Sequence, residues 1–235
     1  MKKSFFVTSC DTDIGKTFIT TALSNYLTKL GVSVRAVKPI VTGWDPEDRD
    51  SDTALILKSL SMSMETEEIE NASPWRYKEP QTPHIAAQNE GRPIHVKEVA
   101  TFCDSPYLNK NIECVLMEGV GGVMTPIDTE HTILDLIAMI ESPVLLVVGT
   151  YLGSISHSLA AEAVLRYNRI AVDCICVNET PGSSVSLDDT VKTLQHFVDA
   201  PIVKVPWSEK EMPEERWEHV AEQMAFMSKV LKILD

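Results

Sequence analysis

The sequence predicts an α/β protein in which a doubly wound, mainly parallel sheet is flanked by helices, and it predicts a single domain over residues 1–235. Short apolar runs rich in β-branched residues, without alternation, are typical of strands buried on both faces of a parallel sheet. Helix-like segments separate these runs, which favours a doubly wound fold with its ligand crevice at the carboxyl ends of the strands. The length is sufficient for one substantial core.

The expected elements follow this alternation. The expected strands cover residues 4–7, 33–40, 114–117, 144–148, 174–177 and 202–205. The expected helices include residues 16–30, 133–140, 154–169 and 187–198. Between residues 44 and 106 Pro, Asp, Glu and Ser are dense, so we expect loops and short helices over the crevice there.

Composition excludes several classes of function. A net charge of −13 argues against binding to nucleic acid or to an anionic membrane, because both need clustered Lys and Arg. No stretch approaches the roughly 20 apolar residues of a membrane helix, and the N-terminal apolar run reads as a strand, not as a signal peptide. The five cysteines are an odd number without a Cys-x-x-Cys pair, which indicates reduced thiols. We therefore expect a soluble, cytoplasmic protein.

The stretch from Thr8 to Thr17 reads T-S-C-D-T-D-I-G-K-T and lies between an expected strand and a helical pattern that Gly31 stops. This is the setting that a phosphate-binding loop needs. The helix start offers N–H groups, Lys16 can reach terminal phosphates, and the Thr17 hydroxyl can hold a divalent cation. The alternative is an ordinary turn with a solvated lysine. Ser9 stands where the pattern usually begins with glycine, and serine adopts positive φ at a higher cost, which leaves the loop's first turn open.

A candidate carboxylate, Glu118, comes directly after the apolar run 114–117 and is followed by Gly119, Gly121 and Gly122. A buried strand that ends in a carboxylate and then glycines places that carboxylate at the crevice, where the backbone can approach a ligand closely. Such a carboxylate can bind Mg²⁺ directly or through water. The alternative is a glycine turn with an incidental exposed glutamate.

Two further charged residues are candidates for the same crevice. Lys38 lies near the end of an expected buried strand, where a lysine is costly unless it is paired with an anion such as a phosphate. The alternative is a lysine whose amine reaches solvent. Ser51 and Asp52 precede the apolar helix-like run 54–60, so a helix N-cap and a metal-binding role for Asp52 both remain open.

Residues 149–157 follow another buried strand and begin another helix. The start of that helix can receive a carboxylate, and a plain strand-to-helix connection is the alternative. His157 is interpreted as a cap or packing residue. We find no Ser/His/Asp or Cys/His arrangement in the sequence.

Taken together, these motifs resemble the dethiobiotin synthetases, ATP-dependent enzymes of the P-loop NTPase superfamily. The matching motifs span most of the chain. They are Thr8 to Thr17, Lys38-Pro39 with Thr42-Gly43, Ser51-Asp52, Thr82-Pro83-His84 with Glu90-Gly91-Arg92-Pro93, Glu118-Gly119-x-Gly121-Gly122, Leu152-Gly153, Asn178, and Ala200-Pro201 leading to Pro206-Trp207. Ser9 departs from the family's loop glycine. The resemblance implies that the base is read around Val177-Asn178-Glu179 and after Pro206, but the residues from Ser208 onward allow no further contacts to be placed, so base selectivity stays open.

The resemblance implies a P-loop NTPase-like fold and a homodimer that acts in biotin biosynthesis. Its substrates would be 7,8-diaminononanoate, CO₂ or bicarbonate, and ATP, and its cofactor Mg²⁺. An amine of the diamine takes up CO₂ as a carbamate, the carbamate attacks the γ-phosphate of ATP, and the second amine closes the ring with loss of phosphate. Phosphoryl transfer of this kind depends on positioning and charge stabilisation and needs no protein nucleophile.

The resemblance also implies roles for single residues. Lys16 and Lys38 would be catalytic and would stabilise charge on the transferring phosphoryl and carbamate oxygens. Mg²⁺ would be held by Thr17, Asp52 and Glu118. The implied nucleotide-binding residues are Asp13, Ile14, Gly15, Lys16, Thr17, Phe18, Asp52, Glu118, Gly119, Gly121 and Asn178. The implied substrate contacts are Thr12, Thr42 and, from across the dimer, Leu152, Gly153 and Ser154.

The alternative function is a nucleotide-switched ATPase of the partitioning or cargo-positioning class. Such proteins typically carry an extra lysine early in the loop, next to glycines, where this chain has Ser9, Cys10 and Asp11. Some also have an amphipathic membrane-binding tail, and apolar residues from Trp217 to Leu234 do form a helical stripe. The polar face of that stripe is rich in glutamate, so we expect it to dock onto the core or a partner subunit. A related amidoligase would need a glutamine-hydrolysing domain, for which the chain is too short.

Overall fold

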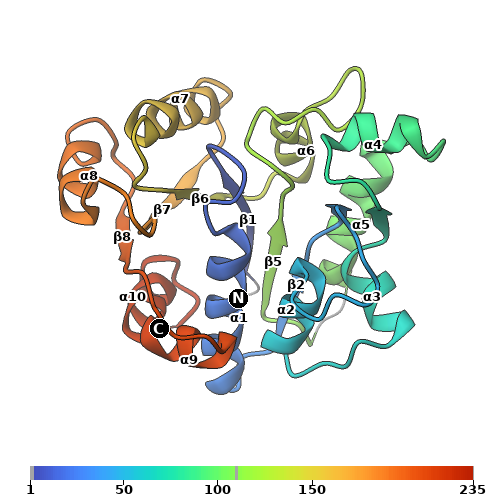
Figure 1. The fold of residues 1–235 in the computed structure, drawn as a ribbon, viewed down its shortest axis with the longest axis horizontal. Helices are drawn as coiled ribbons and strands as arrows, with labels where there is room; N and C mark the ends of the chain where they lie inside the picture. The colour runs from blue at the N-terminus through green and yellow to red at the C-terminus, as the bar shows by residue number, and fades with distance from the viewer. Residues whose placement is uncertain (1–2, 109–110, 235) are drawn as a thin grey trace.

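The computed structural model describes residues 3–108 and 111–234, and it shows the expected doubly wound α/β arrangement with helices on both sides of a central sheet (Figure 1). The sheet has six strands in the order β2-β5-β1-β6-β7-β8. Their bounds are β1 Lys3–Ser9, β2 Val34–Val37, β5 Cys114–Glu118, β6 Val144–Val148, β7 Val172–Asn178 and β8 Ile202–Val205. All neighbouring strands in it are parallel. From β1 the chain passes to the edge strand β2, returns through β5, and then continues on the other side of β1 through β6, β7 and β8.

Two apolar layers cover the sheet, because successive side chains of a strand point to opposite faces. In β1, Phe5 and Val7 are buried in one layer and Phe6 in the other. The first layer is closed by α1 Lys16–Lys29, α2 Asp52–Ser59, α9 Pro213–His219 and α10 Ala221–Val230. The second layer is closed by α4 Pro83–Asn89, α5 Val96–Leu108, α6 Ile133–Ile140, α7 Ser154–Tyr167 and α8 Leu187–Leu194.

The expected single strand over residues 33–40 is wrong. β2 ends at Val37, and the N–H of Lys38 donates to the carbonyl of Ala72 at 3.0 Å. Pro39 has no N–H to donate to a ladder. A separate strand, β3 Ile40–Thr42, then pairs in parallel with β4 Trp75–Tyr77 in a small second sheet. The break therefore moves the chain out of the main sheet directly after Lys38.

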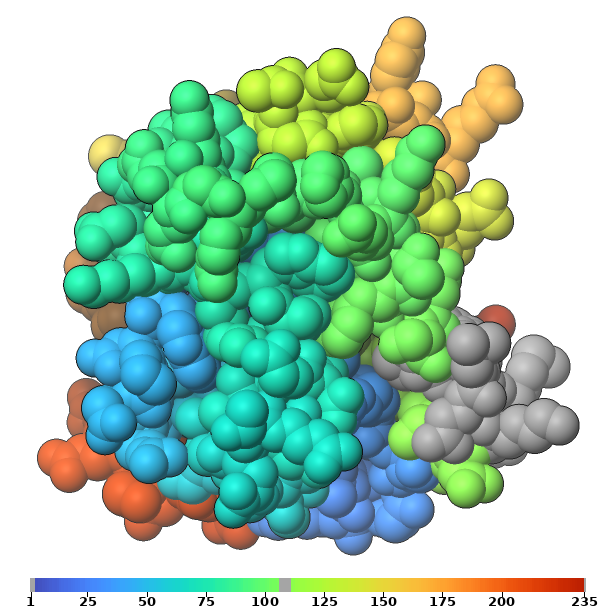
Figure 2. Space-filling view, turned by 90° about the vertical axis from the view of Figure 1, so that its right-hand side faces the viewer, coloured from blue at the N-terminus to red at the C-terminus, as the bar shows by residue number. Residues whose placement is uncertain are grey.

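The region between residues 44 and 106 contains the expected short helices, α2, α3 Thr66–Ala72 and α4. The strand β4 and the 13-residue helix α5 were not expected. Figure 2 shows the face that this region covers, coloured from teal to green. Part of it, residues 80–83, reaches the crevice.

Other boundaries differ by a few residues. The strand expected at 4–7 extends to Ser9, and the helices expected to end at 169 and 198 end at Tyr167 and Leu194. Arg169 has a φ of 60°, which a helix cannot continue through. Among the described residues, no helix is both long and apolar enough to cross a membrane.

The C-terminal apolar stripe docks onto the core as expected, but it does so as two helices, α9 and α10. Trp217, Met224 and Met227 are buried against the layer that contains α1. The indole N–H of Trp217 donates to the Thr21 hydroxyl at 3.0 Å. These contacts place α9 beside the first turns of α1, close to the start of that helix.

Candidate active site

The carboxyl ends of β1, β5 and β2 bring the predicted charged residues together. Val7 pairs with Glu118 across β1 and β5, and β2, which ends one residue before Lys38, pairs with the other side of β5. A cavity of about 600 Å³ opens at this edge. Its lining residues are Thr12, Asp13, Gly15, Lys16, Thr17, Lys38, Thr42, Asp52, Pro80, Gln81, Thr82, Pro83, Val120, Gly121 and Thr125.

The loop between β1 and α1 turns at Asp13 and Gly15, not at Ser9. Gly15 is the N-cap of α1 with φ 94°, and Asp13 has φ 58°. A Cβ on Gly15 would lie 2.2 Å from Nδ2 of Asn178, which donates to the Ile14 carbonyl at 3.0 Å. Glycine is therefore required at this turn both by its φ and by the close approach of Asn178.

The concern that Ser9 must adopt positive φ is wrong, because Ser9 is the last residue of β1 and lies outside the positive-φ positions. Its hydroxyl instead accepts a hydrogen bond from Nζ of Lys16 at 3.0 Å and lies 2.5 Å from the Asp11 carbonyl. Nζ of Lys16 also donates to that carbonyl at 3.2 Å. Ser9 thus contributes a side-chain oxygen that holds the lysine amine inside the loop.

Lys16 is 6% exposed, and its pKa is lowered to about 8. Burial is the largest cause, and repulsion by Lys38 adds to it. Both hydrogen bonds of its amine go to uncharged oxygens. An anionic group in the cavity would therefore stabilise the charged form of Lys16.

Lys38 lies between two carboxylates. Its Nζ is 2.9 Å from Oε1 of Glu118 and forms a second, shorter ion pair with Oδ2 of Asp52. Burial on its own would lower the pKa of Lys38, but the two carboxylates raise it above its ordinary value. Burial raises and the Lys38 charge lowers the pKa of Asp52, and the net shift is downward. Lys38 is therefore a buried, charged lysine, and the solvated alternative is excluded.

The Thr17 hydroxyl joins the same two carboxylates. Its Oγ1 lies 2.8 Å from Oδ1 of Asp52 and 2.7 Å from Oε1 of Glu118, and its single proton can serve only one of them at a time. Ser51 accepts a hydrogen bond from the N–H of Ala54 at 3.4 Å and caps α2. Ser51 is thus the cap, and Asp52 is free to face Thr17.

The cluster of Thr17, Asp52 and Glu118 fits a divalent cation. Glu118 is only 1% exposed, and its Oε2 is buried without a hydrogen-bond partner among the described residues. A buried carboxylate oxygen without a partner is costly, and an oxygen-seeking ion would satisfy it. The described residues contain no group of three or more His, Cys, Asp or Glu side chains that could hold a metal, so such an ion would take further ligands from phosphates and water.

A second cavity of about 320 Å³ lies on the other side of the loop and shares Asp13 and Gly15 with the first. The predicted residues Ile14, Phe18 and Asn178 line it. The segments expected to read the base, around Asn178 and after Pro206, also line it and contribute Glu179 and Trp207. Sequence reasoning missed Arg216, because no pattern marked an arginine in the helix that follows.

The structure does not bring all predicted residues to these cavities. Gly119 is packed against Phe6, where a Cβ would lie 2.9 Å from the ring. Leu152, Gly153 and Ser154 line neither cavity. Leu152 is 83% exposed, Gly153 begins α7 with φ 96°, and the buried hydroxyl of Ser154 has no partner among the described residues.

A second set of contacts ties the start of α7 to the phosphate loop. The Tyr151 hydroxyl lies 2.9 Å from Nδ1 of His157 and donates to Asp11 at 3.4 Å. Cys10 lies 3.9 Å from the same hydroxyl. His157 is thus a packing and hydrogen-bonding residue, as its position at the helix start predicted, and the role of Tyr151 was not predicted.

Comparison with known sequences finds a matching family model and several similar proteins that share one name. A protein-family model described as an AAA domain matches residues 3–215. The protein named ATP-dependent dethiobiotin synthetase BioD from Caulobacter vibrioides (strain NA1000 / CB15N) is 39% identical over 83% of this chain and 88% of its own length. Proteins of the same name from Methylobacterium nodulans and Legionella pneumophila (strain Paris) are 38% and 35% identical, over 77% and 86% of this chain and 82% and 92% of theirs.

Solved structures with a similar fold are more distant in sequence. The MinD cell division protein of Aquifex aeolicus has a TM-score of 0.53 at 16% identity, covering 98% of this chain and 94% of its own. A ParA family ATPase from Chlorobium tepidum TLS also has a TM-score of 0.53, at 15% identity over 99% and 93%. At such identities the likeness shows only the shared fold.

Proposed function

The chain belongs to the family of ATP-dependent dethiobiotin synthetases, and we propose that it forms dethiobiotin from 7,8-diaminononanoate, CO₂ and ATP in biotin biosynthesis. The observation that carries the proposal is the presence, at one end of the sheet, of two buried lysines, Lys16 and Lys38, and of a buried carboxylate, Glu118, that contacts Lys38 and has one oxygen without a partner among the described residues. This arrangement is suited to a triphosphate and a transferring phosphoryl group.

The proposed reaction joins one CO₂ to two amines. One amine of the diamine adds to CO₂ and loses a proton, giving a carbamate, and a carbamate oxygen displaces ADP from the γ-phosphate. The second amine then attacks the carbamoyl carbon, and phosphate leaves as the ureido ring closes. Negative charge develops on the phosphoryl oxygens during transfer, and the amines of Lys16 and Lys38 line the cavity where these oxygens would lie.

We propose that Thr17, Asp52 and Glu118 hold Mg²⁺, which when bound would neutralise charge on the phosphate oxygens. Asp52 and Glu118 already contact Lys38 in this structure. The lysine therefore fixes the orientation of both carboxylates beside the Thr17 hydroxyl. Thr12 and Thr42, which line the same cavity, would contact the diamine.

The position of Leu152, Gly153 and Ser154 supports a homodimer. These residues lie outside the cavity that contains Lys16, yet α7 begins there with an N-terminus that suits a carboxylate. We propose that this helix start receives the substrate carboxylate in the partner's cavity. The highly exposed Leu152 would then be covered by the second subunit.

Complementation between subunits tests the dimer. Lys16→Ala and Leu152→Asp should each inactivate a homodimer, the first by loss of phosphate stabilisation and the second by repelling the substrate carboxylate. When the two variants are mixed and exchanged, one of the two sites in each mixed dimer is intact, so about a quarter of the wild-type activity should return. Failure to recover any activity, with subunit exchange shown by native mass spectrometry, would place both residues in one site within a subunit.

Product analysis tests the reaction itself. The pure protein is incubated with 7,8-diaminononanoate, ¹³C-bicarbonate, ATP and Mg²⁺, and the products are examined by mass spectrometry. We expect labelled dethiobiotin and an equal amount of ADP, with neither formed by Lys16→Ala. ADP without labelled dethiobiotin would refute the proposal and favour the nucleotide-switched ATPase.

The C-terminal apolar stripe does not support the nucleotide-switched ATPase. Trp217, Met224 and Met227 are buried against the core and are not available as a membrane-binding tail. We further propose a single-domain cytoplasmic enzyme. The five cysteines are all free, as expected in a reducing compartment.

A further inference from the structure

The smaller cavity beside the phosphate loop is lined by an arginine, Arg216, to which the proposed reaction gives no role. Arg216, from α9, lines it together with Phe18, Asn178 and Trp207. Because this cavity shares Asp13 and Gly15 with the cavity of the two lysines, a nucleotide whose phosphates lie against the loop would place its base here. This step rests on the proposed use of a nucleoside triphosphate.

Two aromatic rings fix the guanidinium of Arg216. Its Cζ lies 5.2 Å from the centroid of the Phe18 ring and 4.9 Å from the centroid of the Trp207 ring. A planar guanidinium stacks on aromatic faces and keeps its N–H groups in a rigid fork. Trp207 is itself held by its backbone N–H, which donates to Oε2 of Glu179 at 2.9 Å.

The hydrogen-bonding capacity of Arg216 is unused within the described part of the chain. Its Nε is buried and has no hydrogen-bond partner there, and no ion pair joins the guanidinium to a described carboxylate. Most buried polar atoms in proteins have a partner, so a guanidinium that lines a cavity and has no hydrogen bond to a described group indicates a side chain that a ligand completes. A nucleotide base offers ring nitrogens and carbonyl oxygens as acceptors.

Asn178 supplies a hydrogen-bond acceptor, whereas Arg216 supplies only donors. Asn178 lines the cavity, and its Nδ2 donates to the Ile14 carbonyl, which leaves its side-chain oxygen as an acceptor for a ligand. A base that presents both an amino group and an acceptor could then be bound by Asn178 and Arg216 together. A site built with specific hydrogen-bonding groups discriminates strongly against ligands that leave those groups unpaired.

We propose that Arg216 contacts the nucleotide base and determines base selectivity in this enzyme. The residue lies about 200 positions from the phosphate loop in sequence and is brought to it by the docking of α9 on α1 through Trp217. Arg216 acts on binding of the base, whereas Lys16 and Lys38 act on the phosphates.

The test compares Arg216→Met, which keeps the length but removes the charge and donors, with Arg216→Lys, which keeps the charge but replaces the planar fork of donors with an ammonium group. Arg166→Met, at an exposed arginine of α7 paired with Glu162, removes the same charge elsewhere. Titration calorimetry measures binding of ATP, GTP, CTP, UTP and inorganic triphosphate to each protein. Steady-state kinetics then give KM and kcat for the same nucleotides.

For Arg216→Met we expect the Kd and KM of the preferred nucleotide to rise about tenfold, equivalent to about 1.4 kcal/mol. The ratios of affinity among the four nucleotides should fall toward one, and kcat should change by less than about twofold. Binding of inorganic triphosphate should be unchanged, because it contacts only the loop. Arg216→Lys should show most of the same loss, and Arg166→Met none.

Several results would overturn the inference. One is unchanged nucleotide affinity and discrimination in Arg216→Met, and another is a wild-type Kd in Arg216→Lys. Equal weakening of ATP and inorganic triphosphate would mean that the substitution had disturbed the loop and not the base site. If the wild type forms no dethiobiotin, the proposed function fails, but the calorimetric comparison still decides the role of Arg216.

Discussion

Replacement of Lys38 by methionine tests the buried ion pairs at the centre of the site. Methionine fills a similar volume but leaves Glu118, which is 1% exposed, without its cation and with only the Thr17 hydroxyl as a partner. Removing one partner of a buried pair typically costs about 3–5 kcal/mol. Asp52 adds little, because its side chain is 39% exposed and solvent screens its charge. For a chain of this size the loss corresponds to a decrease in Tm of about 6–20 °C.

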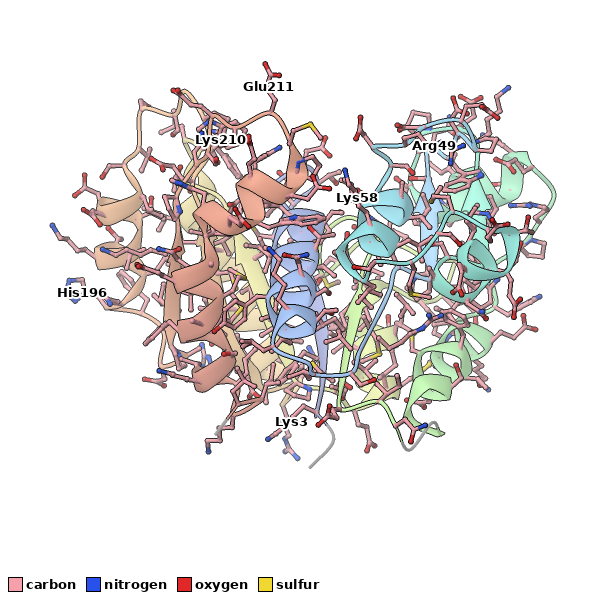
Figure 3. All side chains as sticks on the ribbon, turned by 90° about the horizontal axis from the view of Figure 1, so that it is seen from below. Lys3, Arg49, Lys58, His196, Lys210 and Glu211 are labelled. Carbon is pink, nitrogen blue, oxygen red and sulfur yellow. The ribbon has the colours of Figure 1, made fainter. Side chains whose placement is uncertain are left out.

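Thermal and urea unfolding at pH 7, without nucleotide or metal, measure this loss. Lys58→Met is the matched control, since the ion pair of Lys58 with Glu214 at 3.0 Å lies at the surface, as Figure 3 shows for Lys58. That pair should contribute at most about 1 kcal/mol. The double variant Lys38→Met/Glu118→Gln removes both charges and should regain most of the stability lost in the single variant.

The reasoning is refuted if Lys38→Met is no less stable than Lys58→Met, or if the second substitution regains nothing. Turnover gives an independent check. We expect kcat to fall by about 10²–10³-fold, the scale for loss of one group that stabilises transition-state charge, with little change in the KM of the diamine. A kcat close to that of the wild type would restrict Lys38 to a structural role.

Three further substitutions have separate outcomes. Glu118→Gln should raise the Mg²⁺ concentration needed for half-maximal activity, and an unchanged metal titration would remove Glu118 from the metal site. Gly15→Ala should weaken ATP binding, measured by calorimetry, because the new Cβ meets Asn178 at 2.2 Å, whereas Gly31→Ala has the same kind of positive φ with open space around it and should leave ATP binding intact. Asp135→Ala should cost about 1 kcal/mol in urea unfolding at pH 7 by removing the capping box of α6. Since hydrogen bonds from the N-cap hold the pKa of Asp135 below its ordinary value, this contribution is present above the unfolded pKa of about 3.9 and is lost as the pH falls through the folded pKa, so the difference in stability between the two proteins should shrink as the pH falls below about 3.9. A difference that stays constant as the pH falls would contradict the carboxylate's role.

The strands and the site were predictable where one local pattern determines the structure. β6 and β8 have the bounds expected from their apolar runs. A residue at the carboxyl end of a buried parallel strand, such as Glu118 at the end of β5, lies at the crevice because all carboxyl ends of such a sheet share one edge. The same argument placed Lys38, although the strand before it proved shorter than expected.

The remainder depended on contacts between distant parts of the chain. Pro39 is visible in the sequence, but the pairing of β3 with β4 is set by residues more than 30 positions apart. The loop has positive φ at Asp13, a residue type that tolerates this conformation, and not at Ser9. The absence of a glycine at position 9 therefore has no consequence for the backbone there. Arg216 was missed because its place beside the cavity depends on the docking of α9 beside Phe18.

The two site lysines have opposite pKa shifts although both are 6% exposed, and their partners explain the difference. Lys38 is matched inside the protein by Asp52 and Glu118, so its charge is already compensated before any ligand binds. Lys16 has only uncharged oxygens as hydrogen-bond partners, and its pKa is about 8. Phosphate binding therefore changes the environment of Lys16 far more than that of Lys38. In a strongly acidic chain, Lys16 is thus a buried positive charge without a carboxylate partner among the described residues, which phosphates of the nucleotide would neutralise.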